Sequence, residues 1–302
     1  MAQETDRPVV VAVGHDPVDA ALEYAVAEAR RRGLGVRLVH AVPQAHDGPE
    51  FVLVSAVDRE RLGRQALAAA KEHALDAAGD SVPVTSLLVH GRVVPAVVSV
   101  AADAAMIVAQ GRPLSGVRRA VTRSVTSGLA SRAAVPVVAV PSEVSRDVLA
   151  RDGGTVTVGV DVPERSAALL RAAAGAAAAR SATLHVVHTW HLGSAETAID
   201  VTPADVEDWA AQTGAGIRAV VDRLDEVEGV PVRIDVRHAR PADALVDASR
   251  DSVLLVVGRH DPLVPAGTHL GPVARAVLQG AECPVMVADP GPPRRWRDLL
   301  PG

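Results

Sequence analysis

Aromatic residues are scarce in this chain of 302 residues and make up only 2% of it. Proteins that bind single-stranded nucleic acid usually stack bases on aromatic side chains, and proteins that bind a phosphate backbone carry a basic surface. The chain shows neither feature, because its formal net charge is -5 and its acidic and basic residues are interspersed. We therefore expect no nucleic-acid partner, and cores built from Val, Leu, Ile and Ala.

Lysine and cysteine each occur once, as Lys71 and Cys283. A Walker A loop and a Schiff-base enzyme both need a suitably placed lysine, whereas Lys71 lies in a polar helical pattern. A lone cysteine can form neither an internal disulfide nor a cysteine-rich zinc site. Because Cys283 precedes a proline in an apolar segment, we expect it to be a small buried residue.

Long apolar runs are absent as well. No run reaches the roughly 18 residues that a bilayer-spanning helix needs, and the N-terminal residues lack the apolar stretch of a secretory signal. We therefore expect a cytoplasmic protein with no membrane partner.

What the chain does contain is an internal repeat at an offset of about 148 residues, close to the size of an ordinary domain and far above the period of a solenoid. In this register His40 corresponds to His188, and residues 135–137 correspond to 283–285. We predict two homologous domains joined by a polar linker within residues 142–154. The predicted parts are a first domain, a second domain and a C-terminal tail: 1–145, 153–290 and 291–302.

Each half alternates valine-rich apolar runs with helical patterns. Apolar runs without polar alternation are typical of parallel strands buried on both faces, and their alternation with helices indicates an α/β doubly wound sheet. The predicted strands are 8–13, 35–41, 83–89, 105–109 and 136–140 in the first half, and 155–160, 183–189, 231–237, 253–257 and 284–288 in the second. The predicted helices are 17–32, 56–78, 95–102, 121–132, 164–180, 203–227, 241–250 and 272–279.

A doubly wound sheet binds ligands beyond the carboxyl ends of its strands, where the strand order reverses. In the second half this edge carries Asp161 after the first predicted strand, Gly258 after the fourth, and Gly271 at the start of a helix. Glycine lets the backbone approach a phosphate, and a helix N-terminus offers free N–H groups. This edge is therefore the predicted ligand site.

These residues, the strand phrase 254–258 and the closing phrase 283–287 resemble the universal stress protein family, and the resemblance extends over both halves. It implies two tandem domains of adenine-nucleotide alpha-hydrolase type, each with five parallel strands in the order 3-2-1-4-5. It also implies an ATP site, because many members hold ATP with a Gly-x2-Gly-x9-Gly-Ser/Thr loop and a strand-end aspartate. Pairing through the last strands is implied as well.

The loop of the second half departs from that pattern at two positions. Asp261 stands at the second glycine, and a carboxylate about 4 Å from a phosphate repels it by roughly 1 to 4 kcal/mol. Pro272 replaces the hydroxyl residue and lacks a backbone N–H. A Mg²⁺ ion can offset only the first of these losses. The residues expected to contact a nucleotide are Asp161, Gly258, Asp261 and Gly271.

The first half departs further from the pattern. Gln110, Pro113 and Arg123 occupy the glycine positions, Gly14 replaces the aspartate, and only Ser124 matches. We therefore expect any ATP site in the second half rather than in the first. Around this loop lie Arg112, Arg118, Arg119 and Arg123. Arginines suit another anion or an acidic partner surface, although exposed arginines are common in this chain.

The histidines give weaker signals. His40 and His188 end the second strands near the ligand edge, where either nucleotide contact or a strand-end hydrogen bond explains them. His185 and His188 should point to opposite faces of their strand, which argues against a metal site. No catalytic triad can be assigned from spacing.

The sequence thus predicts a non-catalytic stress-response or regulatory protein with weakened or lost ATP binding, and with Mg²⁺ only if ATP binds. One alternative is weak Mg²⁺-dependent ATP binding and hydrolysis, with Asp161 and Asp261 holding the metal. Another is an interaction scaffold without a small ligand. The expected partners are the other domain through the apolar strands 136–140 and 284–288, a second copy of the chain, and an unidentified regulatory protein.

Overall fold

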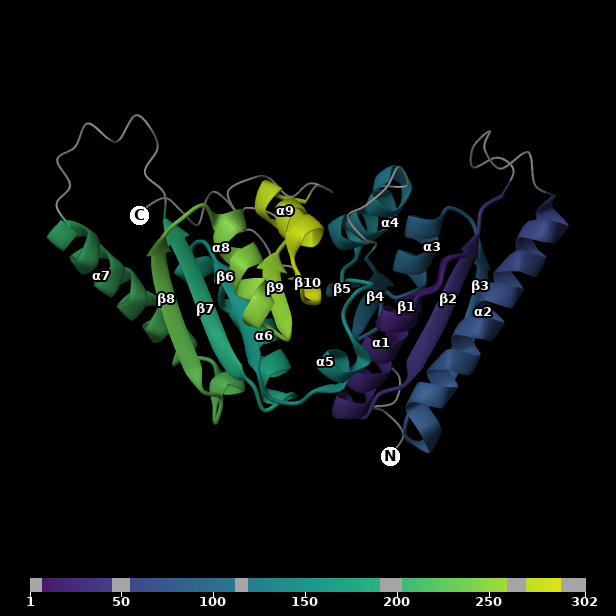
Figure 1. The fold of residues 1–302 in the computed structure, drawn as a ribbon, viewed down its shortest axis with the longest axis horizontal. Helices are drawn as coiled ribbons and strands as arrows, with labels where there is room; N and C mark the ends of the chain where they lie inside the picture. Colours follow the sequence, from purple (N-terminus) through teal and green to yellow (C-terminus); the bar gives the residue numbers. More distant parts are fainter. Residues whose placement is uncertain (1–6, 45–54, 112–118, 191–202, 260–269, 289–302) are drawn as a thin grey trace, which may run out of the picture. The chain divides into compact units, whose positions relative to one another are not determined.

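The computed structural model describes residues 7–44, 55–111, 119–190, 203–259 and 270–288. The chain divides into two compact units, Met1–Arg151 and Asp152–Gly302. Each unit is an α/β structure in which parallel strands alternate with helices (Figure 1).

The first unit contains a parallel sheet in the order β3-β2-β1-β4-β5. Its helix α1 packs on β1, β4 and α2, whereas α3 packs on β2 and α4. The strands β1, β4 and β5 are almost wholly buried, as their Val-rich sequences predict. The strands are β1 (Val9–Ala12), β2 (Val36–Val42), β3 (Val84–His90), β4 (Met106–Gln110) and β5 (Val137–Val140). The helices are α1 (Asp19–Arg32), α2 (Ala56–Ala78), α3 (Val93–Val100), α4 (Arg119–Arg132) and α5 (Arg146–Ala150), with the 3-10 turn η3 (Gly79–Ser81).

The second unit repeats this plan in the order β8-β7-β6-β9-β10. Its strands are β6 (Thr155–Val160), β7 (Thr183–Trp190), β8 (Val232–His238), β9 (Leu254–Gly258) and β10 (Val285–Ala288). Its helices are α6 (Ala167–Ala178), α7 (Pro203–Val221), α8 (Pro241–Ala248) and α9 (Pro272–Gly280), with the 3-10 turns η4 (Pro163–Arg165), η5 (Asp225–Val227) and η6 (Ser249–Asp251).

The predicted α/β fold class is therefore confirmed. All ten predicted strands form within one or two residues of their expected bounds, and in both units the first strand lies between the second and the fourth, as the order 3-2-1-4-5 requires. In the described residues no helix is both long and apolar enough to cross a membrane. Cys283 is buried, as expected, and burial raises the pKa of its thiol to about 12.

The residues that the sequence analysis assigned to the linker include a helix. α5 packs on α1, with Leu149 buried. The Arg31 guanidinium donates to the carbonyls of Ala150 and Arg151 at 3.0 and 3.1 Å, which satisfies carbonyl groups at the C-terminal end of this short helix. This part of the linker therefore belongs to the first unit.

Candidate functional site

In the first unit a cavity of about 990 Å³ lies at the carboxyl ends of β1, β2 and β4. The strand order reverses here, because β1 lies between β2 on one side and β4 on the other. The volume is at the upper end of the range typical of small-molecule sites. The walls come from these strand ends, from the loop between β1 and α1, and from α2, α3 and α4.

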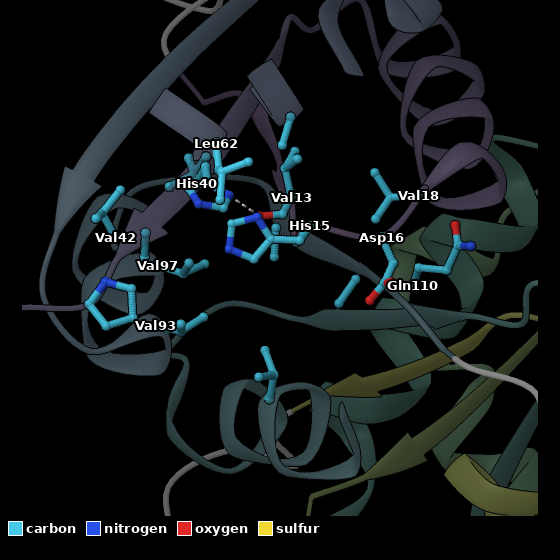
Figure 2. A pocket seen from close by; sticks show the side chains of 18 of the residues that line it. Val13, His15, Asp16, Val18, His40, Val42, Leu62, Val93, Val97 and Gln110 are labelled. Atoms are coloured by element: carbon cyan, nitrogen blue, oxygen red, sulfur yellow. Dashed lines mark hydrogen bonds between the residues drawn. The ribbon is translucent and has the colours of Figure 1, made fainter. Parts of the chain in front are cut away.

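The cavity has an apolar end and a polar end. Figure 2 shows Val42, Val93 and Val97 at one end, and Asp16 and Gln110 at the other. Apolar walls with a few polar groups are typical of small-molecule sites, in which the polar groups fix the orientation of the ligand.

His40 lies in the middle of the cavity wall, where it is buried but serves the fold. Its Nδ1 lies 2.9 Å from the carbonyl oxygen of Val13, so it ties the end of β2 to the end of β1. Burial lowers the pKa of His40, the Val13 hydrogen bond opposes this, and His15 adds to the lowering. The ring is therefore neutral at pH 7.

The helix α2 approaches the other side of the His40 ring at Gly63. A Cβ atom at Gly63 would lie 2.6 Å from Cδ2 and 2.9 Å from Nε2 of His40. The close approach therefore requires glycine. His15 touches the same ring edge-on, with the ring centroids 4.9 Å apart (Figure 2).

Gln110 closes the polar end of the cavity. Its side-chain oxygen accepts from the backbone N–H of Ala21 at 3.1 Å, and its amide nitrogen donates to the carbonyl of Pro17 at 3.3 Å. The N-terminal residues of α1 make no capping bond through the side chain of Val18. Gln110 thus satisfies an N–H group that would otherwise be available to an anion.

The predicted site of the second unit is partly described. Asp161 follows β6 and is exposed, and Gly258 ends β9, which pairs with β6. Gly271 caps the N-terminus of α9, and its N–H donates to the carbonyl of Arg259, next to Gly258, at 2.9 Å. These three residues therefore lie at one edge of the sheet. Asp261 lies outside the described residues.

His188 repeats the role of His40 in the second unit. Its Nδ1 lies 3.0 Å from the carbonyl oxygen of Val160 at the end of β6. The structure thus shows a strand-end hydrogen bond for both histidines, which was one of the two explanations left open by the sequence.

Two tryptophans gather beside His188, and the sequence analysis missed them. The ring of Trp209, on α7, lies 6.0 Å from that of His188 and 5.2 Å from that of Trp190, at the end of β7. Trp190 stacks on His238, at the end of β8, with ring centroids 4.3 Å apart. The available signal was the presence of tryptophan at a strand end in a chain with three tryptophans.

The arginine-rich loop of the first unit lies largely outside the described residues. This holds for Arg112 and Arg118, and the side chains of Arg119 and Arg123 at the start of α4 are likewise not described. Among the described residues, no group of three His, Cys, Asp or Glu side chains is placed to hold a metal ion.

The fold and the site define a class of protein: two α/β units of one plan, with a ligand-sized cavity at the strand-order reversal of the first. The model of the universal stress protein family matches residues 6–141 and 154–289, and the chain belongs to this family.

Known proteins resemble the chain over nearly its whole length. It is 31% identical to a universal stress protein of Mycobacterium tuberculosis over 292 residues, which cover 93% of this chain and 96% of that protein. A second protein of that name from the same species is 28% identical over 95% of this chain and 96% of its own length. The crystal structure of a universal stress protein from Archaeoglobus fulgidus shares the fold, with a TM-score of 0.65 at 13% identity, over 94% of this chain and 97% of that one.

Proposed function

We propose that the chain is a non-catalytic regulatory protein of the universal stress family, and that its first unit binds a small ligand of the adenine nucleoside class. The observation that carries this proposal is the cavity at the carboxyl ends of β1, β2 and β4. Its aliphatic walls suit the faces of a purine ring, and its polar end suits the sugar. The family resemblance points to adenine as the ring.

The contacts at the polar end favour a nucleoside or a monophosphate over ATP. Gln110 already uses the N–H of Ala21, and the carboxylate of Asp16 lines the cavity next to it. Among the lining residues that the structure describes, Arg59 is the only arginine or lysine. Within this described part of the site, a triphosphate would face the Asp16 carboxylate with Arg59 to balance its charge.

A second candidate site is the edge of the second unit, where ATP with Mg²⁺ was expected from the sequence. It is supported by the positions of Asp161, Gly258 and Gly271, which lie at one edge. Pro272 opens α9 and removes one N–H from its first turn, which weakens the anion site there. We therefore assign weak ATP binding at most to this edge.

The non-catalytic role is supported by the way His40 is held. One ring nitrogen is bonded to Val13 and the other faces Gly63 on α2, so the ring acts as a strut between elements. A cytoplasmic location, pairing of the two units through their last strands, a homodimer and a regulatory partner all stay predictions from the sequence.

The test is to release and identify small molecules that copurify with the folded protein, and then to titrate adenosine, AMP and ATP calorimetrically with and without Mg²⁺. We expect adenosine and AMP to bind better than ATP. Val93→Trp fills the apolar end of the cavity and should abolish binding, whereas Val57→Trp, at a residue that is 76% exposed on α2, should leave it unchanged. Equal affinities in both variants would refute the cavity as the site.

The enzyme alternative has its own measurement. Mg²⁺-dependent release of phosphate from ATP that disappears in Asp161→Ala would establish hydrolysis at the second unit. If adenosine binds and no phosphate is released, the regulatory role holds. If no nucleoside or nucleotide binds to the native chain, the interaction scaffold is the remaining hypothesis.

A further inference from the structure

The two units can be superposed residue by residue at the ligand edge from their hydrogen bonds alone. His40 and His188 bond the equivalent carbonyls, those of Val13 and Val160. Two residues further along each strand, the carbonyl of Val42 accepts from Gly91, and that of Trp190 accepts from Ala239. Trp190 therefore stands in the second unit where Val42 lines the cavity of the first.

The helices α2 and α7 correspond in the same way. The inward face of α2 includes Gly63, Leu67, Ala70 and Ala74, and that of α7 includes Ala210, Gly214, Ile217 and Val221. The residue before the first of these is Leu62 in α2 and Trp209 in α7, and both are 41% exposed. Trp209 therefore stands where Leu62 lines the cavity.

The two indole rings contact each other, and Trp209 also contacts the counterpart of a cavity-lining residue. Trp209 faces His188, the counterpart of a cavity-lining residue, and meets Trp190 at an interplanar angle of 64°. The ring of His238 stacks on that of Trp190, with an interplanar angle of 29°. Edge-to-face and stacked contacts of this kind hold aromatic side chains together.

We infer that Trp190 and Trp209 take up, in the second unit, the position that the ligand ring occupies in the first. The indoles are a built-in replacement for the ring, and the chain binds one adenine nucleoside, in its first unit. This inference rests on the proposed function of the first unit. It also assigns Leu62 and Trp209, which occupy equivalent positions in the two units, as the residues that determine how many adenine nucleosides the chain binds.

The test exchanges these residues between the units. In the double variant Trp190→Val with Trp209→Leu, the second unit carries the residues of the first, and the number of adenosine molecules bound per chain should rise from one to two. Trp209→Tyr keeps an aromatic ring in place and should leave the number at one. The measurement is calorimetric titration with adenosine.

The reverse exchange keeps the inference testable even if the double variant fails to fold. Leu62→Trp should weaken adenosine binding by at least about tenfold, because an indole then overfills the cavity. Leu75→Trp is the matched control: it lies on the same helix, is 44% exposed and does not line the cavity, so the affinity should not change.

The outcomes separate the inference from the proposed function. Two adenosine molecules bound by the native chain would overturn the inference and leave the proposed function intact. No adenosine bound by the native chain would overturn the proposed function. A folded double variant that still binds one, or a Leu62→Trp variant with native affinity, would show that the indoles do not replace the ring.

Discussion

The two units have the same arrangement of strands at this edge of the sheet but place different side chains along it. Each ties its second strand to its first by a histidine, with bonds of 2.9 and 3.0 Å. Around that bond the first unit places Leu62 and Gln110, and the second places Trp209 and Gly258. The comparison teaches that the sheet fixes the position of this edge, whereas a few side chains along it decide its chemical character.

A second difference lies inside the sheets. Across β6, β7 and β8 of the second unit runs a polar row in which Thr157 lies beside His185 and His185 beside Arg233. The hydroxyls of Thr157 and Ser252 are 2.7 Å apart, and Ser252 also donates to the carbonyl of Ala248. In the first unit the counterpart of Thr157 is Val10, which is fully buried. The first core is therefore apolar at a point where the second depends on hydrogen bonds.

The largest expected effect concerns Cys283. Because it is the only cysteine of the chain, its labelling reports on the folding of the second unit alone. Burial raises the pKa of its thiol from 9.0 to about 12, so about a thousandfold less thiolate forms than in an exposed cysteine. We expect maleimide labelling of the native protein to be slower than that of the urea-unfolded protein by at least this factor. Labelling at similar rates would show that the second unit is open around β10.

The polar row should make the stability of the second unit sensitive to the replacement of Thr157 by valine, the residue type that the first unit has at this position. Thr157→Val removes the bonds of the Thr157 hydroxyl to Ser252 and His185, which keep their bonds to Ala248 and Arg233, and should cost about 0.5–1.5 kcal/mol of unfolding free energy. Cys283 labelling across a urea series measures that loss in the second unit.

The control for this change is the double variant Thr157→Val with Ser252→Ala. Ser252 corresponds to Ala104, since the two make equivalent bonds from their N–H groups, to Ser249 and Ala101. Because Thr157 and Ser252 bond each other, the double variant should lose less stability than the sum of the two single losses. A double variant that loses the sum of the single losses would contradict this account.

The same row should make the second unit weaker in mild acid. Burial lowers the pKa of His185, Arg233 lowers it further, Asp235 opposes them and Arg237 adds to the lowering. The unfolded chain, with an ordinary histidine pKa near 6.5, therefore binds more protons than the folded unit just below that pH. Stability is full above about pH 6.5 and falls as the pH drops towards the lowered pKa of the folded state.

The residue that tests this is His185 itself. In His185→Gln, Cys283 labelling should vary less between pH 7 and pH 5.5 than in the native chain. Asp235 does not confound this range. Burial would raise the pKa of Asp235, but the hydrogen bond and charge of Arg237 outweigh burial and hold it below its ordinary value of 3.8. An unchanged pH profile in the variant would assign the acid sensitivity to another group.

The smallest expected effect concerns Gln110. Gln110→Gly frees the N–H of Ala21 and should strengthen ATP binding to the first unit about two- to fivefold, the range of a helix N-terminus acting on an anion. Adenosine affinity should not change, because it carries no phosphate. A loss of adenosine affinity would mean that Gln110 supports the cavity rather than competing with phosphate.

Much of the fold could be predicted because strand and helix are local properties. The unalternating Val-rich runs give β1, β4 and their counterparts, and the internal repeat carries the assignment from one half to the other. The helix α5 was missed because it has only five residues and lies in a polar segment. It depends on contacts to α1 that are remote in sequence, such as the Arg31 bonds to its last carbonyls.

The site was harder to predict because its content depends on three-dimensional register. The ligand edge itself followed from the strand order, and Asp161, Gly258 and Gly271 do lie along it. The cavity of the first unit was not expected, because a comparison with the nucleotide-loop pattern shows only that Gln110 stands where the pattern has a glycine. The contact between Trp190 and Trp209 depends on which face of α7 is turned towards β7, and sequence spacing does not give this.

The folded half of the linker has a consequence for how such a protein can change over time. α5 is held on the first unit by the Arg31 bonds, and Gly153 and Gly154 are held on the second unit by backbone bonds to Arg180 and Thr183. The units are therefore tied by a very short joint at Arg151 and Asp152, and share an effective concentration on the order of millimolar. In a dimer of identical chains, every mutation alters both sites at once. One continuous chain keeps two dissimilar sheet edges in a fixed ratio, so that each edge can change its side chains independently of the other.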